Sequence, residues 1–332
     1  MLRLVAAADG YLARVRLPGG LVEAAGLRAL AAASTDLGDG RLELTSRGNV
    51  QLRALQADDW QELGARLADA GLWPSVRHER VRNIVASPLA DLADMVRALD
   101  AALCADPRLA ELSGRFLFGI DDGRGDIAAL NPDVLAVPPS VEGAAVDDVI
   151  AGMLNVARAF LDERTAQGSG AWRIDELDDG RVRVRERLGN TAPIAAVAAP
   201  PPAPAGPIDG GHVLLVPLGR LTASQADWLA GRIGAGTAKI TPWRSVVLPT
   251  ADVSGAEDLG FGIDASSRWY GVSACAGQPG CDKALADVQS EATRTAGTWR
   301  DVHFSGCGRR CGRPAGTAVD VIATEDGYVV QQ

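Results

Sequence analysis

Residues 41–55 read RLELTSRGNVQLRAL, in which two strand-forming segments flank a polar turn. Apolar residues alternate with polar ones on either side, and Thr, Ser, Gly and Asn fill the middle, as in a β-hairpin. A second stretch, AKITPWRSVVLPT at residues 238–250, repeats this order, so that Thr45 aligns with Thr241 without a gap. The chain therefore contains a candidate internal repeat.

The sequence before each hairpin repeats as well. The segments GYLARVRLPGG (10–20) and GHVLLVPLGR (211–220) both have a strand pattern followed by Pro and Gly, and helical stretches follow at 21–34 and 224–236. Each copy thus predicts a strand, a helix and a strand–turn–strand unit. The alternative is two unrelated α+β units of similar make-up.

Between the copies, APIAAVAAPPPAPAGPIDGG favours neither a buried strand nor a stable helix, because it is dominated by proline and alanine. We expect a semi-rigid linker over residues 192–208. Each half continues into a second module of further strands and helices. At 332 residues with 47% hydrophobic residues, the chain is long enough for more than one core.

Four of the five cysteines form two close pairs, Cys275 with Cys281 and Cys307 with Cys311, in the glycine-rich segments CAGQPGC and CGRRC. Thiolates favour iron–sulfur clusters, zinc or copper(I), and glycines let backbone amides approach inorganic sulfur. The gap within the first pair is wider than zinc sites usually have, so a cluster is the first expectation, with zinc, disulfides or inert thiols as alternatives. Cys104, on an apolar helical stretch, is expected to be a small core residue.

Charge and hydropathy exclude several classes of protein. With a net charge of −9, the chain lacks the basic surplus that nucleic-acid binding requires. No apolar stretch is long enough to span a membrane, and the apolar run after Met1 is too short for a secretory signal. We expect a soluble cytoplasmic protein. Of its 33 basic residues only Lys239 and Lys283 are lysines, so an anionic ligand must be bound largely by arginine.

The order TSRGNVQLRAL, VRNIVASP, a Pro/Ala junction and a second half with the cysteine pairs resembles the sulfite and nitrite reductase family over essentially the whole chain. The resemblance implies an α+β fold with duplicated ferredoxin-like half-domains, two α/β modules and pseudo-twofold symmetry. The implied parts are a first half-domain (1–72), a reductase-type α/β module without cluster cysteines (73–191), the linker (192–208), a second half-domain (209–255) and a 4Fe-4S cluster module (256–332).

Within this family, SGRFLFGIDDGRGD, ITPWRSVVLP and SGCGRRCGRP resemble the precorrin-3B synthases of aerobic cobalamin synthesis. This resemblance implies a [4Fe-4S] cluster on the four paired cysteines and a tetrapyrrole substrate, precorrin-3A, which is hydroxylated at C20 and closed as a lactone. Dioxygen and NADH-derived electrons, delivered by an electron-donor protein, are consumed, and a mononuclear non-haem iron is expected to activate oxygen. The alternatives are a sirohaem-dependent sulfite or nitrite reductase and a non-catalytic zinc- or tetrapyrrole-binding protein.

Either tetrapyrrole carries several carboxylates, which the planar guanidinium group of arginine binds well. Position within the family's motifs makes these residues candidates for tetrapyrrole binding: Arg47, Arg82, Asn83, Arg115, Arg124 and Arg244. Arg244 is placed near the position of Arg47 in the second copy, and for each arginine a surface charge or a structural ion pair is the alternative.

Two further residues are candidates for catalysis or iron binding. Asp122 lies in a glycine-bracketed turn and His303 lies four residues before Cys307, so a turn cap and an ordinary strand residue are their alternatives. The matching reductase segment uses lysines to deliver protons. Arginine, whose pKa is too high for that task, favours the oxygenase over the reductase.

Overall fold

The computed structural model describes residues 3–190, 205–314 and 316–332. The chain divides into two compact units. Unit 1 comprises Met1–Val15, Val22–Leu72 and Ala203–Gln332, and unit 2 comprises Arg16–Leu21 and Trp73–Pro202. Most of the predicted linker, residues 192–204, lies outside the described residues. Its predicted end is wrong, because Gly206–Ile208 form a strand that pairs with Gly211–Val213.

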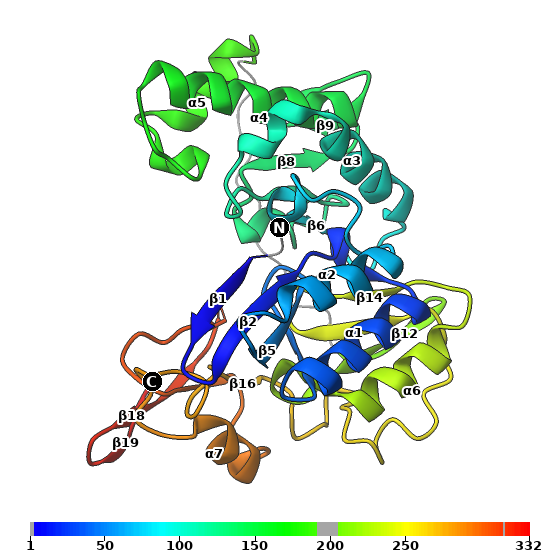
Figure 1. Ribbon diagram of the computed structural model, residues 1–332, viewed down its shortest axis with the longest axis vertical. Coiled ribbons are helices and arrows are strands. Elements are labelled where there is room, and N and C mark those ends of the chain that lie inside the picture. The colour runs from blue at the N-terminus through cyan, green and yellow to red at the C-terminus, as the bar shows by residue number, and fades with distance from the viewer. Residues whose placement is uncertain (1–2, 191–204, 315) are drawn as a thin grey trace. The chain divides into compact units, whose positions relative to one another are not determined.

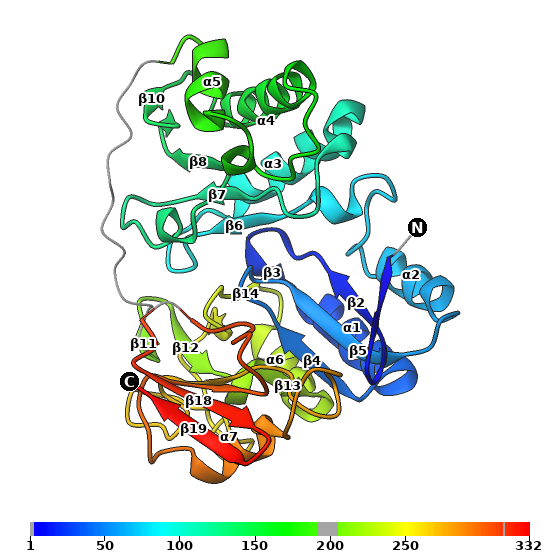
Figure 2. The same ribbon diagram turned by 90° about the vertical axis from the view of Figure 1, so that its left-hand side faces the viewer.

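Unit 1 contains two five-stranded sheets that confirm the predicted duplication. The first has the order β1-β2-β5-β4-β13 and the second the order β11-β12-β15-β14-β3. Each sheet takes its last strand from the other copy, so β13 pairs antiparallel with β4 and β3 lies beside β14 (Figure 2). The strands are β1 (Leu4–Ala7), β2 (Gly10–Val15), β3 (Leu21–Val22), β4 (Arg41–Leu44), β5 (Val50–Leu55), β11 (Gly206–Ile208), β12 (Gly211–Leu215), β13 (Arg220–Thr222), β14 (Ala238–Ile240) and β15 (Ser245–Leu248).

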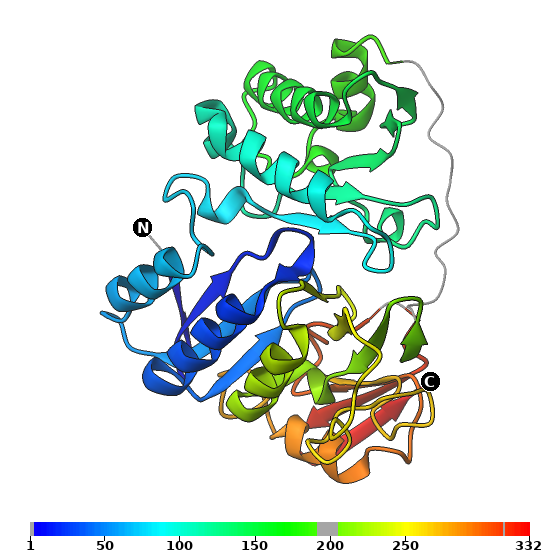
Figure 3. The same ribbon diagram turned by 90° about the vertical axis from the view of Figure 1, so that its right-hand side faces the viewer.

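Three helices belong to these half-domains: α1 (Ala24–Leu37), α2 (Trp60–Asp69) and α6 (Ala223–Ile233). Helices α1 and α6, the equivalent helices of the two copies, lie side by side (Figures 1 and 3). The start of α6 follows from its sequence, since the Thr222 hydroxyl accepts from the backbone of Gln225 while the Gln225 side chain accepts from that of Thr222.

The two hairpins are equivalent in detail, because a threonine hydroxyl accepts from the turn backbone in each. Thr45 accepts from the N–H of Asn49 at 3.1 Å, and Thr241 accepts from the N–H of Ser245 at 3.2 Å. This equivalence makes more exact the expectation that Arg244 lies near the position of Arg47. Arg244, at φ 60°, occupies the place of Gly48, at φ 66°, and not that of Arg47.

The rest of unit 1 is a four-stranded sheet with one helix. Strands β16 (Val272–Ala274), β17 (Val302–Ser305) and β18 (Val319–Thr324) are parallel, and β19 (Gly327–Gln331) pairs antiparallel with β18. Helix α7 (Val288–Thr295) packs against β16 and β17 (Figure 1). Its start is fixed by Asp287, whose side chain accepts from the N–H of Ser290 and caps the helix there.

Unit 2 repeats this strand pattern. Strands β6 (Ile84–Ala86), β7 (Phe118–Ile120) and β8 (Val134–Val137) are parallel, and β9 (Ser140–Val141) and β10 (Ala144–Ala145) follow antiparallel. The helices are α3 (Ala93–Ala105), α4 (Val149–Ala166) and α5 (Gly180–Arg187). The core contains Phe116, whose ring centroid lies 5.2 Å from that of Phe118 and 5.0 Å from that of Phe160. Cys104 is half-buried on α3 rather than fully in this core.

Short 3-10 turns complete the chain at Pro18–Gly20, Glu79–Val81, Pro107–Glu111, Ala128–Leu130, Ile174–Glu176 and Pro217–Gly219. Within the described ranges, no helix is both long and apolar enough to cross a membrane.

Candidate metal centre

The two cysteine pairs begin at the same edge of the C-terminal sheet. Cys275 directly follows β16, and Cys307 follows β17 after a single glycine. These strands are parallel neighbours with Ala274 opposite Phe304, so their carboxyl ends meet. The N–H of Cys275 donates to the Phe304 carbonyl at 2.9 Å, and the N–H of Gly306 donates to the Cys275 sulfur at 3.1 Å. Cys275 is thus held by the sheet itself, and Cys307 lies two residues beyond the end of the neighbouring strand.

Glycine is required where the two cysteine loops pack together. A Cβ atom on Gly306 would lie 2.7 Å from the Cβ atom of Ala284, and one on Gly277 would lie 2.9 Å from a methyl group of Val288. Gly277 also has a φ of 65°, in the left-handed region that other residues rarely adopt. This close packing brings backbone amides to sulfur, as a cluster site requires.

The four paired cysteines are free thiols, so the disulfide alternative is wrong. Tetrahedral zinc, with Zn–S bonds of about 2.3 Å, would hold its sulfur ligands roughly 3.8 Å apart. Among the described residues, no three cysteine sulfurs lie within 4.8 Å of one another. A four-iron cube binds one thiolate at each iron and keeps the sulfurs further apart. Four thiolates in two glycine-rich loops suit a [4Fe-4S] cluster, and the described sulfurs do not form the close set that zinc requires.

The face of the sheet that leads to the cysteines is polar, although it is buried. Side chains alternate along β17, so Val302 and Phe304 join the apolar core while His303 and Ser305 point to the other face. His303 is fully buried, and its Nδ1 lies 2.9 Å from the Ser273 hydroxyl. Neither His303 Nε2 nor the Ser305 hydroxyl has a hydrogen-bond partner among the described residues.

His303 is held as a neutral imidazole. Burial, together with the nearby charge of Arg244, lowers its pKa to about 4. The backbone of Cys311 acts on this pKa in the opposite direction, but no group in the described part of the chain lies in normal hydrogen-bonding geometry to Nε2. The alternative of an ordinary strand residue with all its hydrogen bonds made therefore holds for one ring nitrogen only. Nδ1 has a hydrogen-bond partner and Nε2 has none among the described residues.

Arg244 places a cation beside the cysteine loops. Its side chain packs over Gly219 and donates to the Gly312 carbonyl at 3.1 Å, next to Cys311. Burial lowers its pKa below the usual arginine value, while Glu43 and Cys275 act in the opposite direction. No carboxylate in the described part of the chain lies within ion-pair distance of its guanidinium group. Arg244 is thus a half-buried cation suited to an anionic ligand.

Two further arginines, which sequence reasoning missed, join the first five-stranded sheet to the first cysteine loop. Arg53, on β5, donates to both carboxylate oxygens of Asp9 at 2.9 Å and also to the Gly280 carbonyl, inside the first cysteine loop. Arg220, on β13, donates to Gln289, whose amide in turn donates to the Cys275 carbonyl at 3.2 Å. We call these contacts the arginine clasp. The only sequence signal for Arg53 was its place in QLRAL, on the strand after the polar turn.

The clasp surrounds a buried carboxyl group. Glu43 lies 3.9 Å from Arg53 and 3.5 Å from Arg220, measured between nitrogen and oxygen. Burial nevertheless outweighs both arginines and raises the pKa of Glu43 above its ordinary value. The attraction of Glu43 to Arg53 and Arg220 therefore depends on the protonation state of Glu43.

Arg47 lies in the hairpin turn of the first copy, where its N–H donates to the Thr45 hydroxyl at 3.4 Å. The other predicted ligand-binding residues lie in unit 2. Arg82 is buried and donates through two nitrogens to Asp100 at 2.7 Å, and the Asn83 side chain donates to the Phe116 carbonyl at 3.0 Å. These contacts favour a structural role for Arg82 and Asn83. Their role in tetrapyrrole binding stays a prediction.

Two more predicted arginines are exposed on unit 2. Arg115 pairs with Glu176 at 3.2 Å and lies over the ring of Trp172. Arg124 donates to Asp122 at 2.8 Å. Burial alone would raise the pKa of Asp122, but the hydrogen bonds from Arg124 outweigh it, and the pKa lies below its ordinary value.

Asp121, Asp122 and Asp126 bring their carboxylates within 4.8 Å of one another. Asp121, however, accepts from the backbone amides of residues 123, 125, 127 and 128, so it organises the loop as a turn cap. His78 and His212 contact the carbonyls of Asp106 and Ile263 through Nε2. In the described ranges, no pair of histidines shares a site with a carboxylate. The residues present therefore do not fit the expected mononuclear non-haem iron.

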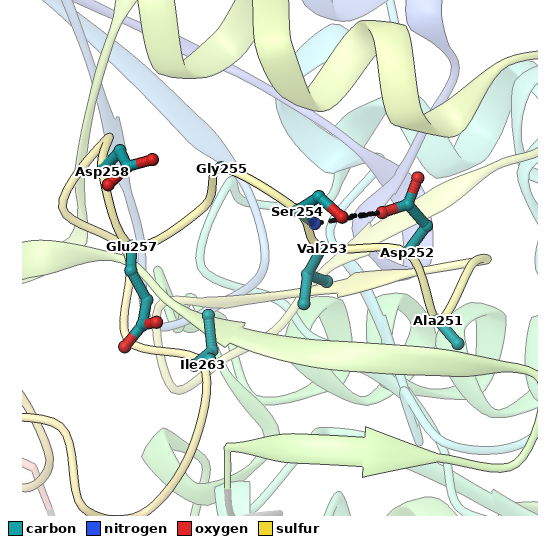
Figure 4. Close-up of a pocket in the computed structure, with 8 residues that line it drawn as sticks. All are labelled: Ala251, Asp252, Val253, Ser254, Gly255, Glu257, Asp258 and Ile263. Atoms are coloured by element: carbon teal, nitrogen blue, oxygen red, sulfur yellow. Dashed lines mark hydrogen bonds between the residues drawn. The ribbon is translucent and has the colours of Figure 1, made fainter.

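One surface cavity of about 370 Å³ lies elsewhere in unit 1, in the loop after β15 (Figure 4). Its carboxylates include Asp252, which accepts from the N–H and hydroxyl of Ser254. Neither the cysteines nor the predicted arginines line it. Because its lining is acidic, it does not suit a polycarboxylate.

Comparisons with known proteins agree with this geometry. Residues 6–70 match the nitrite/sulfite reductase ferredoxin-like half domain. The chain is 27% identical to a ferredoxin–nitrite reductase of Synechococcus elongatus, over 97% of this chain and 78% of that protein. It is 25% identical to a precorrin-3B synthase of a Sinorhizobium species, over 96% of this chain and 79% of that protein.

Among solved structures, the Mycobacterium tuberculosis NirA protein has the same fold. The TM-score is 0.70 at 20% sequence identity, and the match covers 96% of this chain and 73% of NirA. The half-domain match, the relatives and the fold all agree, and the chain is similar to the sulfite and nitrite reductase family over most of its length.

Proposed function

We propose that this protein is an oxygenase of the precorrin-3B synthase type, which converts precorrin-3A to precorrin-3B with dioxygen and NADH-derived electrons. Its [4Fe-4S] cluster would be bound by Cys275, Cys281, Cys307 and Cys311. When bound, such a cluster passes single electrons, received here from an electron-donor protein. The full-length relationship to a precorrin-3B synthase supports this proposal.

The observation that carries the proposal is the state of Arg244. A half-buried guanidinium group close to the cysteine loops, without a carboxylate partner among the described residues, is expected to bind an anion from outside the chain. Precorrin-3A carries several carboxylates. In this proposal Arg244 binds one of them and orients the macrocycle beside the cluster, and Arg47 is the candidate for a second.

The kind of cation separates an oxygenase from a reductase. Six-electron reduction of sulfite or nitrite consumes several protons, for which lysine is a suitable donor and arginine is not. Lys239 and Lys283 are the only lysines in the sequence. Lys239 lies on β14 and Lys283 is exposed in the first cysteine loop. An arginine-based site holds a carboxylate in place without titrating, which suits a substrate that must stay oriented.

A sirohaem-dependent nitrite or sulfite reductase is the second candidate. The 27% identity to a ferredoxin–nitrite reductase favours it. In that case Arg244 would hold a carboxylate of a permanent cofactor instead of a substrate.

The test is a turnover assay on protein purified and loaded with its cluster without air. With precorrin-3A, a reduced electron donor and ¹⁸O₂, we expect a product that carries one atom of ¹⁸O by mass spectrometry. The matched control is Arg244→Lys, which keeps the charge but loses the planar donor geometry and should raise KM more than it lowers kcat. Bound sirohaem, with reduction of nitrite or sulfite and no labelled tetrapyrrole, would contradict the proposal.

A further inference from the structure

The Ser305 hydroxyl is an unexplained polar group at the end of β17, two residues before Cys307. Ser305 is fully buried, and its Oγ has no hydrogen-bond partner among the described residues. A buried hydroxyl without a partner costs about 1–3 kcal/mol. A serine here is therefore unfavourable unless another group, absent from the polypeptide itself, accepts its proton.

The direction of the side chain follows from the strand. Phe304 belongs to the apolar core, so Ser305 faces the other side of the sheet, as His303 does. Ser273 lies opposite His303 and Ala274 lies opposite Phe304, and continuing this register by one residue pair brings Cys275 beside Ser305. The next residue, Gly306, donates its N–H to the Cys275 sulfur. Ser305 thus lies next to the amide of Gly306, where the strands β16 and β17 end and lead to Cys275 and Cys307.

We infer that the Ser305 hydroxyl donates a hydrogen bond to a sulfur atom of the bound iron–sulfur cluster and thereby raises its reduction potential. This inference rests on the proposed cluster. A reduced cluster carries one more negative charge than an oxidised one, so a donor to sulfur stabilises the reduced form more. The hydroxyl then has the acceptor that the polypeptide alone does not give it.

The test is a reduction-potential titration of the cluster-loaded protein, followed by electron paramagnetic resonance. Ser305→Thr keeps the hydroxyl, and Ser305→Val has nearly the same shape without it, so this pair isolates the hydrogen bond from packing. We expect the Thr variant to match the wild type, and the Val and Ala variants to share a lower potential. Ser273→Ala is the matched control, because its hydroxyl already contacts His303 and Val302.

A second readout does not depend on potential. After exchange into D₂O, wild type and Ser305→Thr should show one more exchangeable deuteron coupled to the cluster than Ser305→Val, in electron–nuclear double resonance. Equal potentials and equal deuteron couplings across all variants would overturn the inference while leaving the cluster intact. Wild-type protein that binds no iron–sulfur cluster would instead refute the proposed function and this inference with it.

Discussion

Replacement of Arg53 by methionine should release the first cysteine loop. Arg53 makes a two-nitrogen ion pair with Asp9 and a hydrogen bond to the Gly280 carbonyl, and its side chain is only 7% exposed. Removal of one partner from a buried ion pair costs about 3–5 kcal/mol, because the other charge stays behind. Asp9 keeps 17% of its side-chain exposure, so the lower end, about 3 kcal/mol, is expected.

That magnitude corresponds to roughly a hundredfold change in an opening equilibrium, since 1.4 kcal/mol is about tenfold. Native-state hydrogen exchange, read by mass spectrometry on the cluster-free protein, measures it locally. Peptides over β5 and over residues 275–285 should both exchange about a hundredfold faster in Arg53→Met. The added change Asp9→Asn should recover part of the loss, because it removes the stranded charge.

The matched control is Arg66→Met. Arg66 also contacts two carboxylates, Glu62 at 2.8 Å and Asp36 at 2.5 Å, but its side chain is 30% exposed. Surface pairs of this kind contribute about 0.2–1 kcal/mol. If both variants exchange alike, or if Arg53→Met loosens β5 and leaves the cysteine loop unchanged, the clasp does not hold the loop and the reasoning fails.

Three other variants test separate parts of the site. Arg244→Gly should leave the free energy of unfolding in urea unchanged or raise it by about 1 kcal/mol, because a non-glycine residue at φ 60° is strained. Its affinity for the tetrapyrrole, measured by fluorescence quenching, should nevertheless fall at least tenfold. Unchanged affinity would show that Arg244 is not part of the site. Burial raises the pKa of Glu43, so the stability that Glu43 confers is present below the ordinary glutamate pKa of 4.5 and is lost as pH rises through the folded-state pKa. Glu43→Gln should flatten this loss in urea midpoints measured from pH 4 to 8. An unaltered pH profile would contradict the burial argument. Cys275→Ser should abolish cluster absorbance and Cys104→Ser should not, and a retained band in the first variant would refute the ligand assignment.

Local features of the fold could be predicted from the sequence. The hairpins follow from turn formers between alternating apolar residues, and the cysteine pairs follow from their spacing in glycine-rich loops. Arg244 was expected near the position of Arg47, and the backbone matches it to the next residue, Gly48, by their positive φ. Likewise Pro207 suggested a linker, but β11 is an edge strand, where proline is tolerated.

The contacts that position the site were beyond sequence reasoning, because they join distant parts of the chain. Arg53 and Gly280 are 227 positions apart, and nothing in QLRAL or CAGQPGC indicates that they meet. Ser305 looked ordinary within VHFSGC until the structure showed it buried without a partner. Burial and pairing of charges depend on tertiary packing, so the motifs made Arg82 and Arg244 equal candidates. Of these two residues, Arg82 is paired with Asp100 and Arg244 lacks a carboxylate partner in the described structure.

The most direct test of the account is an absorption spectrum with iron, sulfide and zinc analysis on protein purified without air. The account predicts a broad brown iron–sulfur band, about four irons and four sulfides per chain, and no tetrapyrrole bands. Intense sirohaem bands would make the protein a reductase, and a colourless, zinc-loaded protein would contradict the cluster and with it the proposed electron transfer.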